Sequence, residues 1–483
     1  MKVLFVTSEA VPLVKTGGLA DVSGALPIAL RQQGIDVRVM LPGYGAVLGW
    51  VDGSARMVAE LALPAFPPAR LLEAELPSGV PLLVLDCPEL YAREGGPYQQ
   101  ATGSDWPDND IRFGLLSRAA ALLAHESSPL TWRPDVLHCN DWQTALAPTY
   151  LAFMPGARAR TLMTIHNLAY QGIFPTTAVP RVGLPWESFK VDGVEFYGNL
   201  SFLKGGLFYA DRLNTVSPTY AREIQHEPLG FGLQGLLAWR TKDLSGILNG
   251  IDTDAWNPAT DPLIPRRYRS ATLGRKIDNK RALQERVRLE PSASTPLVGV
   301  VSRFTYQKGL DLLLAAAERM LKLPVQLVVL GSGDAPLESS FLELAALHPG
   351  KIAVQVGFDE ALSHLIEAGA DAFLMPSRYE PSGLNQMYSQ RYGTPVIARA
   401  TGGLVDSVVD CTPETRADGT CTGFLFAEPT PDALYAAVER AVATYHDRRV
   451  WRQLQRHGMD RDYSWDASAR GYAALYEAVT KPT

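Results

Sequence analysis

Two short segments of the sequence combine cations with glycines in a pattern that suits a phosphorylated ligand. Lys15 stands just before Gly17 and Gly18. Paired glycines let the backbone approach a ligand closely, and a helix that begins there offers free N–H groups to an anion. Arg303 and Lys308 lie in the second segment, where arginine can bind two phosphate oxygens at once and lysine adds a point charge. These residues predict a diphosphate site. The alternative is that both segments are surface turns whose cations are solvated and bind no ligand.

A third segment carries an acid, Glu380, within the run Glu-Pro-Ser-Gly-Leu. The run follows a predicted strand and opens a predicted helix, which is where catalytic groups collect in parallel sheets. Gly383 and Leu384 can offer backbone N–H groups to a phosphate. A glutamate that merely caps a helix is the alternative. We expect Glu380 to be catalytic.

Polar residues also follow other predicted strands, among them Asp141, His166 and Asn249. A lone histidine is more often structural than catalytic, and none of the three is decisive alone. Because ligands of parallel α/β sheets bind beyond the carboxyl ends of the strands, we expect these side chains to face one cleft together with the residues above.

The elements that must position these residues alternate between short apolar runs and helical segments. In the first half, strands are expected at 3–7, 36–41, 82–86, 135–138, 161–165, 212–216 and 245–248, and helices at 20–33, 111–124 and 199–210. Continuous apolar strands between helices are typical of parallel sheets that are covered on both faces.

The alternation stops at residues 257–269, which contain three prolines and predict a linker. It then restarts, with strands expected at 297–302, 326–330, 352–356, 372–375, 396–398 and 424–426, and helices at 308–321, 360–369, 384–392, 432–445, 450–457 and 467–478. The fold class is therefore α/β, with two doubly wound parallel-sheet domains that face each other across a cleft.

The four-residue word Thr-Gly-Gly-Leu occurs at 16–19 and again at 401–404, followed in each case by Asp21 or Asp406. Recurrence of so short a word indicates either a shared structural purpose in the two halves or a coincidence.

The composition bounds the class of protein. The chain has 483 residues, 46% of them apolar, with 45 Lys+Arg against 51 Asp+Glu and a net charge of −6. Disordered chains are poorer in apolar residues, and nucleic-acid binders usually carry basic runs, which are absent here. No apolar run is long enough for a membrane span, and the N-terminus lacks the apolar core of a signal peptide. We expect a cytoplasmic protein without nucleic-acid or membrane partners.

Several catalytic patterns are missing from the sequence. It has no His-Glu-x-x-His, no Cys/His cluster, no Gly-x-Ser-x-Gly, no dinucleotide-binding Gly-x-Gly-x-x-Gly and no P-loop. Its four cysteines form no Cys-x-x-Cys pair and are read as reduced thiols. No Asp-x-Asp pair ends a strand, so we expect no metal and no other cofactor, with Lys15, Arg303 and Lys308 neutralising the diphosphate.

Taken together, the motifs resemble those of bacterial glycogen synthases and the related plant starch synthases. The matching segments are KTGGLADV at 15–22, TIHNLAYQG at 164–172, TVSPTYAREI at 215–224, LNGIDTDAWNPATD at 248–261, VSRFTYQKGLDL at 301–312, RYEPSGL at 378–384 and ATGGLVDSV at 400–408. They occur in the family's order and cover essentially the whole chain.

This resemblance implies a GT-B fold with two Rossmann-like domains: 1–253 on the acceptor side, 254–458 for the nucleotide-sugar donor, and a helix within 459–483 that returns to the first domain. It implies transfer of glucose from ADP-glucose to the non-reducing end of glycogen or another α-1,4-glucan, with retention at the anomeric carbon.

The resemblance also implies roles for single residues. Glu380 would be the essential acid beside the glucosyl group, and His166 would hold sugar hydroxyls. ADP-glucose would be bound by Lys15, Gly17, Gly18, Asp141, Asn249, Arg303, Lys308, Gly383 and Leu384. For the mechanism we favour same-face attack, in which the departing phosphate takes the acceptor's proton; a covalent intermediate on Glu380 is the alternative.

Three departures from the family pattern bear on fine contacts. Asp141 lies in Asn-Asp-Trp-Gln without the usual flanking histidines, Ser382 replaces a common cysteine, and Arg399 stands alone where many members have two arginines. UDP-glucose as the donor, a non-catalytic glucan-binding protein, and a phosphorylase are the rival interpretations. The last would need a cofactor lysine, and no site for one is found.

Overall fold

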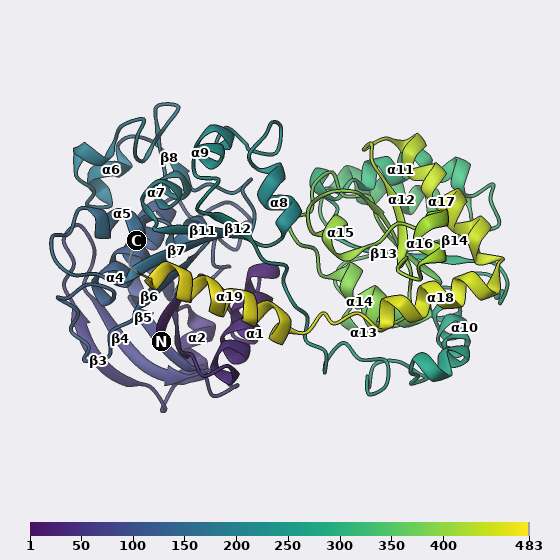
Figure 1. Ribbon diagram of the computed structural model, residues 1–483, viewed down its shortest axis with the longest axis horizontal. Helices are drawn as coiled ribbons and strands as arrows, with labels where there is room; N and C mark the ends of the chain where they lie inside the picture. Colours follow the sequence, from purple (N-terminus) through teal and green to yellow (C-terminus); the bar gives the residue numbers. More distant parts are fainter. Residues whose placement is uncertain (482–483) are drawn as a thin grey trace. The chain divides into compact units, whose positions relative to one another are not determined.

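Two sheets organise the chain in the computed structural model, which describes residues 1–481. One unit comprises Met1–Gly250 together with the chain from Trp465 onward, and the other comprises Ile251–Ser464. Figure 1 shows the helix α19 (Trp465–Thr480), in yellow, packed with the elements of the first unit. This helix contacts α1 (Gly18–Gln32), β6 (Val136–Asn140) and β7 (Arg160–Ile165).

The first unit is built on a nine-stranded sheet of order β12-β11-β7-β6-β1-β2-β5-β4-β3. Its other strands are β1 (Lys2–Val6), β2 (Asp36–Pro42), β3 (Arg56–Leu61), β4 (Ala69–Glu75), β5 (Pro81–Asp86), β11 (Arg212–Thr215) and β12 (Leu244–Gly246). The seven strands from β12 to β5 pair in parallel, and β4 and β3 add an antiparallel edge. The central strands are almost wholly buried, which explains their continuous apolar runs.

The predicted parallel strands of this unit are confirmed, but the helix expected at 199–210 is wrong at its beginning. Residues Asn199–Ser201 form β10, which pairs with β8 (Ile173–Phe174) and β9 (Glu195–Phe196) in a small separate sheet. The helix α7 (Phe202–Tyr209) begins only after Ser201, whose hydroxyl accepts a hydrogen bond from the Lys204 N–H. A serine cap ends the strand and starts the helix at that point.

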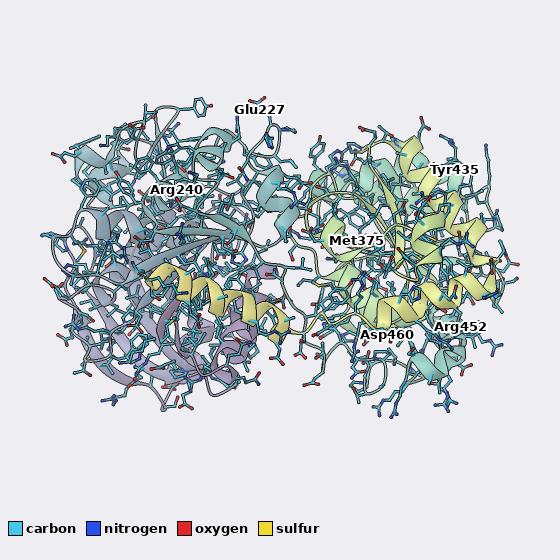
Figure 2. The ribbon with its side chains drawn as sticks, viewed as in Figure 1. Glu227, Arg240, Met375, Tyr435, Arg452 and Asp460 are labelled. Atoms are coloured by element: carbon cyan, nitrogen blue, oxygen red, sulfur yellow. The ribbon has the colours of Figure 1, made fainter. Side chains whose placement is uncertain are left out.

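The second unit has a six-stranded parallel sheet of order β15-β14-β13-β16-β17-β18. Its strands are β13 (Leu297–Val301), β14 (Gln326–Gly331), β15 (Ile352–Val356), β16 (Ala372–Met375), β17 (Val396–Arg399) and β18 (Gly423–Phe426). The helices used below are α10 (Lys276–Arg286), α11 (Leu310–Met320), α13 (Glu360–Gly369), α14 (Asn385–Arg391), α15 (Gly402–Ser407) and α17 (Pro431–Tyr445). Apolar clusters cover both faces of this sheet, as predicted for a doubly wound domain. Met375, the last residue of β16, is labelled in Figure 2 and is buried in this unit.

The proline-rich segment 257–269 contains no strand or helix, as predicted, but it is not a free linker. Its Asp261 is buried and accepts hydrogen bonds from the Tyr392 hydroxyl at 2.6 Å and from His364 Nδ1 at 2.9 Å. Ile264 and Tyr268 are buried in a small cluster of the same unit. Buried side chains within an irregular backbone thus assign the segment to the second unit.

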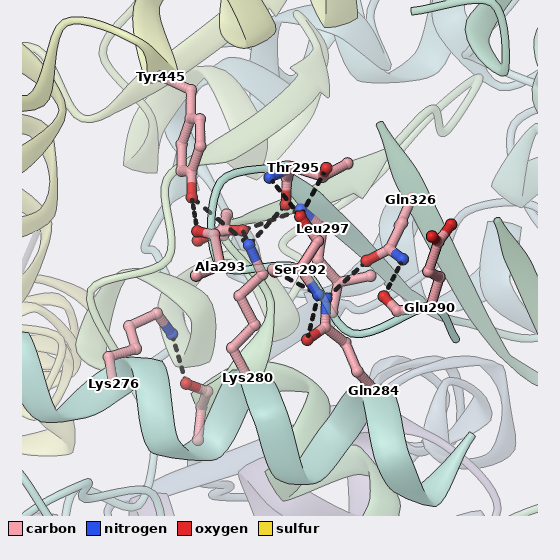
Figure 3. A network of polar contacts seen from close by, with 12 residues as sticks. Lys276, Lys280, Gln284, Glu290, Ser292, Ala293, Thr295, Leu297, Gln326 and Tyr445 are labelled. Carbon is pink, nitrogen blue, oxygen red and sulfur yellow. Dashed lines mark hydrogen bonds and ion pairs between the residues drawn. The ribbon is translucent and has the colours of Figure 1, made fainter. Parts of the chain in front are cut away.

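Helix α10 anchors the second unit through a buried polar network (Figure 3). Lys280 Nζ lies 2.7 Å from Asp371 Oδ2 and donates to the Thr295 carbonyl at 2.6 Å. The same carboxylate oxygen accepts the Leu297 N–H at 2.9 Å. The ion pair therefore joins α10 to the strand β13 at its first residue.

No helix within residues 1–481 is both long and apolar enough to cross a membrane.

Removing the Lys280 charge should destabilise the second unit. In Lys280→Met the Asp371 carboxylate is left buried without its cation, which costs about 3–5 kcal/mol. Urea unfolding monitored by fluorescence measures the loss. The exposed Lys322 provides the matched control, because Lys322→Met removes the same charge from the surface. Equal stability of the two variants would show that the buried pair contributes nothing.

Candidate active site

The loops after β13 and β16 carry the cations and the acid of the second unit. These strands are parallel neighbours, so their carboxyl ends lie at the same edge of the sheet. Arg303 and Lys308 follow β13, and Glu380 follows β16. All three residues thus lie just after the ends of strands, as predicted.

A partly buried lysine, Lys308, forms an ion pair with the buried Glu380. Lys308 Nζ lies 2.6 Å from Glu380 Oε2, with only 6% of the glutamate side chain exposed. The Ser377 hydroxyl donates to the same oxygen at 2.9 Å. Because the cation and the hydroxyl both donate to the same oxygen, the carboxylate is fixed in orientation.

Arg303 is exposed, and its guanidinium forms no hydrogen bond or ion pair with any residue in the described part of the chain. A free guanidinium at the edge that holds the Lys308–Glu380 pair can receive an anionic ligand.

Gly383 and Leu384 come directly before α14. Gly383 has φ +71°, a conformation that favours glycine, and Leu384 is the N-cap residue of the helix. Their backbone thus reaches the start of α14 by a tight turn from Glu380. Both residues therefore lie on the Glu380 loop. That their N–H groups bind a phosphate stays a prediction.

A large aromatic side chain at the same edge was missed by the sequence analysis. Phe358 follows β15 and is 89% exposed. Exposed phenylalanine of this kind offers a flat apolar face to a ring such as a nucleobase. The signal in the sequence was a phenylalanine directly after a glycine at a strand end, which is too common to single out.

In the first unit, Asp141 and His166 follow the neighbouring parallel strands β6 and β7 and are in contact. Asp141 Oδ1 accepts the His166 N–H at 2.7 Å and the Asn167 N–H at 3.3 Å. Asp141 has φ +56° and ψ −177°, which is a strained conformation for a residue with a side chain. Burial raises its pKa to about 7, while the two N–H donors oppose that rise.

His166 is neutral at physiological pH, because burial lowers its pKa to about 3. Its Nε2 lies 2.9 Å from Asn140 Oδ1, and Asn140 Nδ2 donates to the Val6 carbonyl at 3.0 Å. This second bond turns the amide oxygen of Asn140 toward the ring, so Nε2 carries the proton and Nδ1 is left as an acceptor. Such an imidazole suits a sugar hydroxyl rather than a phosphate.

Lys15, Gly17 and Gly18 lie at the start of α1, as predicted, but part of their binding capacity is already used. The Thr16 and Gly17 N–H groups both donate to Glu9 Oε2, the second at 3.1 Å. Lys15 Nζ pairs with Asp21 Oδ1 at 2.7 Å, and its side chain is 54% exposed.

Glu9 is a buried acid that the sequence analysis missed. Its other carboxylate oxygen accepts the Tyr98 hydroxyl, and burial raises its pKa while these three bonds lower it. A glutamate in the loop after β1 gave no signal, because its contact with Tyr98, far along the chain, cannot be read from the sequence.

Asn249 follows β12 in the first unit and is buried. Its Oδ1 atom has no hydrogen-bond donor among residues 1–481. A buried acceptor without a donor costs free energy, which a ligand hydroxyl can recover.

A hollow of about 450 Å³ lies at the opposite edge of the first unit's sheet, at the amino ends of β1, β6 and β7. Its arginines Arg158 and Arg160 pair with Asp211. Because the candidate residues follow the carboxyl ends of the strands, this hollow is not part of their site.

Within the described residues, no group of three or more His, Cys, Asp or Glu side chains could hold a metal ion.

Comparison with known proteins matches both units. Residues 2–239 match the family model of the starch synthase catalytic domain, and residues 283–457 match glycosyl transferases group 1. The glycogen synthase of Nitrosomonas eutropha is 57% identical, with 99% of this chain and 96% of that protein covered. The glycogen synthase of Nitrosospira multiformis is 55% identical, with 99% and 97% covered.

Among solved structures, the catalytic domain of starch synthase IV from Arabidopsis thaliana, bound to ADP and acarbose, superposes with a TM-score of 0.86 at 33% identity and covers 99% of both chains. The two parallel-sheet units are those of a GT-B glycosyltransferase. With relatives of this identity along nearly its whole length, the chain belongs to the glycogen synthase family.

Proposed function

We propose that this protein transfers glucose from ADP-glucose to the non-reducing end of glycogen or another α-1,4-glucan, with retention at the anomeric carbon, in the cytoplasm. The observation that carries the proposal is the Lys308–Glu380 ion pair at the sheet edge that also carries the free guanidinium of Arg303. The starch synthase IV structure at 33% identity, which contains ADP and acarbose, supports this donor and acceptor.

The donor diphosphate would be held by cations of the second unit. Lys308 Nζ donates to Glu380 alone within the described residues, and an ammonium has three N–H groups. Two donors therefore remain for phosphate oxygens, and Arg303 adds its planar fork. Gly383 and Leu384 would give N–H groups to the distal phosphate, and Phe358 would stack on the base. Lys15, Gly17 and Gly18 would add contacts from the first unit.

The chemistry follows from where charge develops. Departure of ADP puts negative charge on the diphosphate and positive charge on the glucosyl carbon. Fixed cations stabilise the first charge, and such preorganised electrostatics is usually the largest catalytic contribution. Glu380 stabilises the second, and the departing phosphate oxygen takes the acceptor's proton in a same-face attack.

Sugar hydroxyls would be held by groups of the first unit. His166 Nδ1 would accept a hydrogen bond from a hydroxyl, because the ring is neutral with its proton on Nε2. The unpaired Oδ1 of Asn249 would accept a second hydrogen bond, and Asp141 orients the His166 loop through the two backbone N–H groups that donate to it.

Glu380→Gln tests the acid. Loss of the negative charge should lower kcat for glucose transfer by about 10²–10³-fold, the usual cost of a lost electrostatic stabiliser. Incorporation of labelled glucose from ADP-glucose into glycogen measures it. The exposed Glu343 on the same unit provides the control Glu343→Gln. Unchanged transfer in Glu380→Gln would remove the acid from the mechanism, and a trapped glucosyl ester on Glu380 would overturn same-face attack.

Arg303→Lys tests the diphosphate contact. The charge is kept and the bidentate geometry is lost, so the KM for ADP-glucose should rise about tenfold, which is about 1.4 kcal/mol. Steady-state kinetics with ADP-glucose and with UDP-glucose measure both this loss and the choice of donor. Arg449→Lys, at an exposed position, serves as the control. An unchanged KM in Arg303→Lys would place the diphosphate elsewhere.

Asp141 predicts a pH dependence. Its raised pKa of about 7 means that the carboxyl keeps its proton below that pH and is ionised above it. The ionised form accepts both N–H groups of the His166 loop, so kcat/KM should rise as the pH increases through about 7. Asp141→Asn should lose this rise. If kcat/KM rises with pH in the same way in the wild type and in Asp141→Asn, the titrating group is a residue other than Asp141.

A further inference from the structure

The backbone of the loop that carries Glu380 is held by groups from the two helices that follow it. The Gly403 N–H, at the start of α15, donates to the Glu380 carbonyl at 3.0 Å and to the Pro381 carbonyl at 3.2 Å. Gln386 Nε2, from α14, donates to the Ser382 carbonyl at 2.8 Å. Three successive carbonyls of the loop thus have their partners in these two helices.

Glycine is required where α15 meets the loop. Gly402 has φ +46°, and a Cβ there would lie 1.9 Å from the Glu380 carbonyl oxygen. A Cβ on Gly403 would lie 2.1 Å from the Ser382 carbonyl oxygen. Neither distance leaves room for a side chain, so only a glycine pair lets α15 approach this closely.

The first occurrence of Thr-Gly-Gly-Leu serves a different purpose. A Cβ on Gly17 or Gly18 would meet no atom within 4 Å. The glycines of the first unit therefore leave open space, whereas those of the second unit hold a loop.

Gln386 belongs to a buried chain of hydrogen bonds that connects the two helices. It is fully buried. Gln390 Nε2 donates to the Gln386 carbonyl at 3.2 Å and to the Ser407 carbonyl at 3.1 Å. The Ser407 hydroxyl donates to the Gly403 carbonyl at 2.5 Å. This series of hydrogen bonds starts at the Ser382 carbonyl and returns to the Glu380 carbonyl through Gly403. A shift of either helix therefore moves the Glu380 loop.

We propose that Gly403 and Gln386 are positioning residues that act through Glu380: they fix the backbone from which the carboxylate reaches the Lys308–Glu380 pair. This rests on the proposed function. A displacement of a reacting group by about 1 Å costs about 10²-fold in rate. The backbone contacts and the side-chain contacts of Glu380 with Lys308 and Ser377 together determine where its charge lies.

Gln386→Met and Gly403→Ala test this role. The methionine keeps the volume and removes the donor, and the alanine methyl pushes the loop away. For each we expect kcat for glucose transfer to fall about 10- to 100-fold, while the KM for ADP-glucose and the Kd of ADP change less than about threefold, because the cations Arg303 and Lys308 lie on a different loop, the one after β13.

Two variants of the same unit serve as matched controls. Gln284 is a buried glutamine that donates to the Ser292 carbonyl at 3.0 Å in the network of Figure 3. Gly369 ends α13, where a Cβ would meet the Asn279 carbonyl oxygen at 2.8 Å. Gln284→Met and Gly369→Ala should lower the urea midpoint by similar amounts and leave kcat unchanged.

A double variant separates positioning from general loss of structure. If Gln386 acts through Glu380, adding Gln386→Met to Glu380→Gln should lower kcat less than about threefold further. A full additional loss, or equal kcat in the two test variants and their controls, would overturn the proposal. If the wild type fails to transfer glucose from ADP-glucose to glycogen, the proposed function fails instead. If one test variant does not fold, the other and its control still decide.

Discussion

The contact between Lys308 and Glu380 is the interaction on which the chemistry of the second unit depends. Two parallel strands bring their loops to one edge of the sheet, and one loop carries the cation while the other carries the acid. Burying a carboxylate alone would cost several kcal/mol, and the lysine ammonium 2.6 Å from the glutamate oxygen offsets that cost. Lys308 can therefore bind two anions, the Glu380 carboxylate and a phosphate, since its remaining N–H groups are free to donate.

The two units differ in the kind of group that they offer to a ligand. At the second unit's edge stand an exposed arginine, a lysine and an acid, which suit the charged part of a sugar nucleotide. The first unit's edge holds a neutral imidazole, a buried amide oxygen and a carboxyl of raised pKa, which suit hydroxyl groups. This division follows from burial, because desolvation keeps His166 uncharged and raises the pKa of Asp141 to about 7, so that both groups act mainly through hydrogen bonds.

Features that depend on residues close together in the sequence could be predicted, whereas contacts between residues far apart in the sequence could not. Parallel strands are predictable because strands such as β1 and β13 are continuous apolar runs, and the positions of Arg303 and Glu380 after their strands follow from that. The partly exposed β3 and the short β10 were missed, since neither carries such a run. Glu9, in the loop between β1 and α1, was missed as well, because it meets Tyr98 only through the fold. The sequence alone leaves the purpose of the repeated Thr-Gly-Gly-Leu word open, and the structure shows that the glycines of its two copies meet different surroundings.

A crystal structure with a non-transferable ADP-glucose analogue tests the central claim most directly. We expect Arg303 and Lys308 to lie within hydrogen-bond distance of the diphosphate oxygens and the Glu380 carboxylate to lie beside the glucosyl ring. An analogue whose diphosphate contacts neither cation, or whose glucose lies away from Glu380, would contradict it.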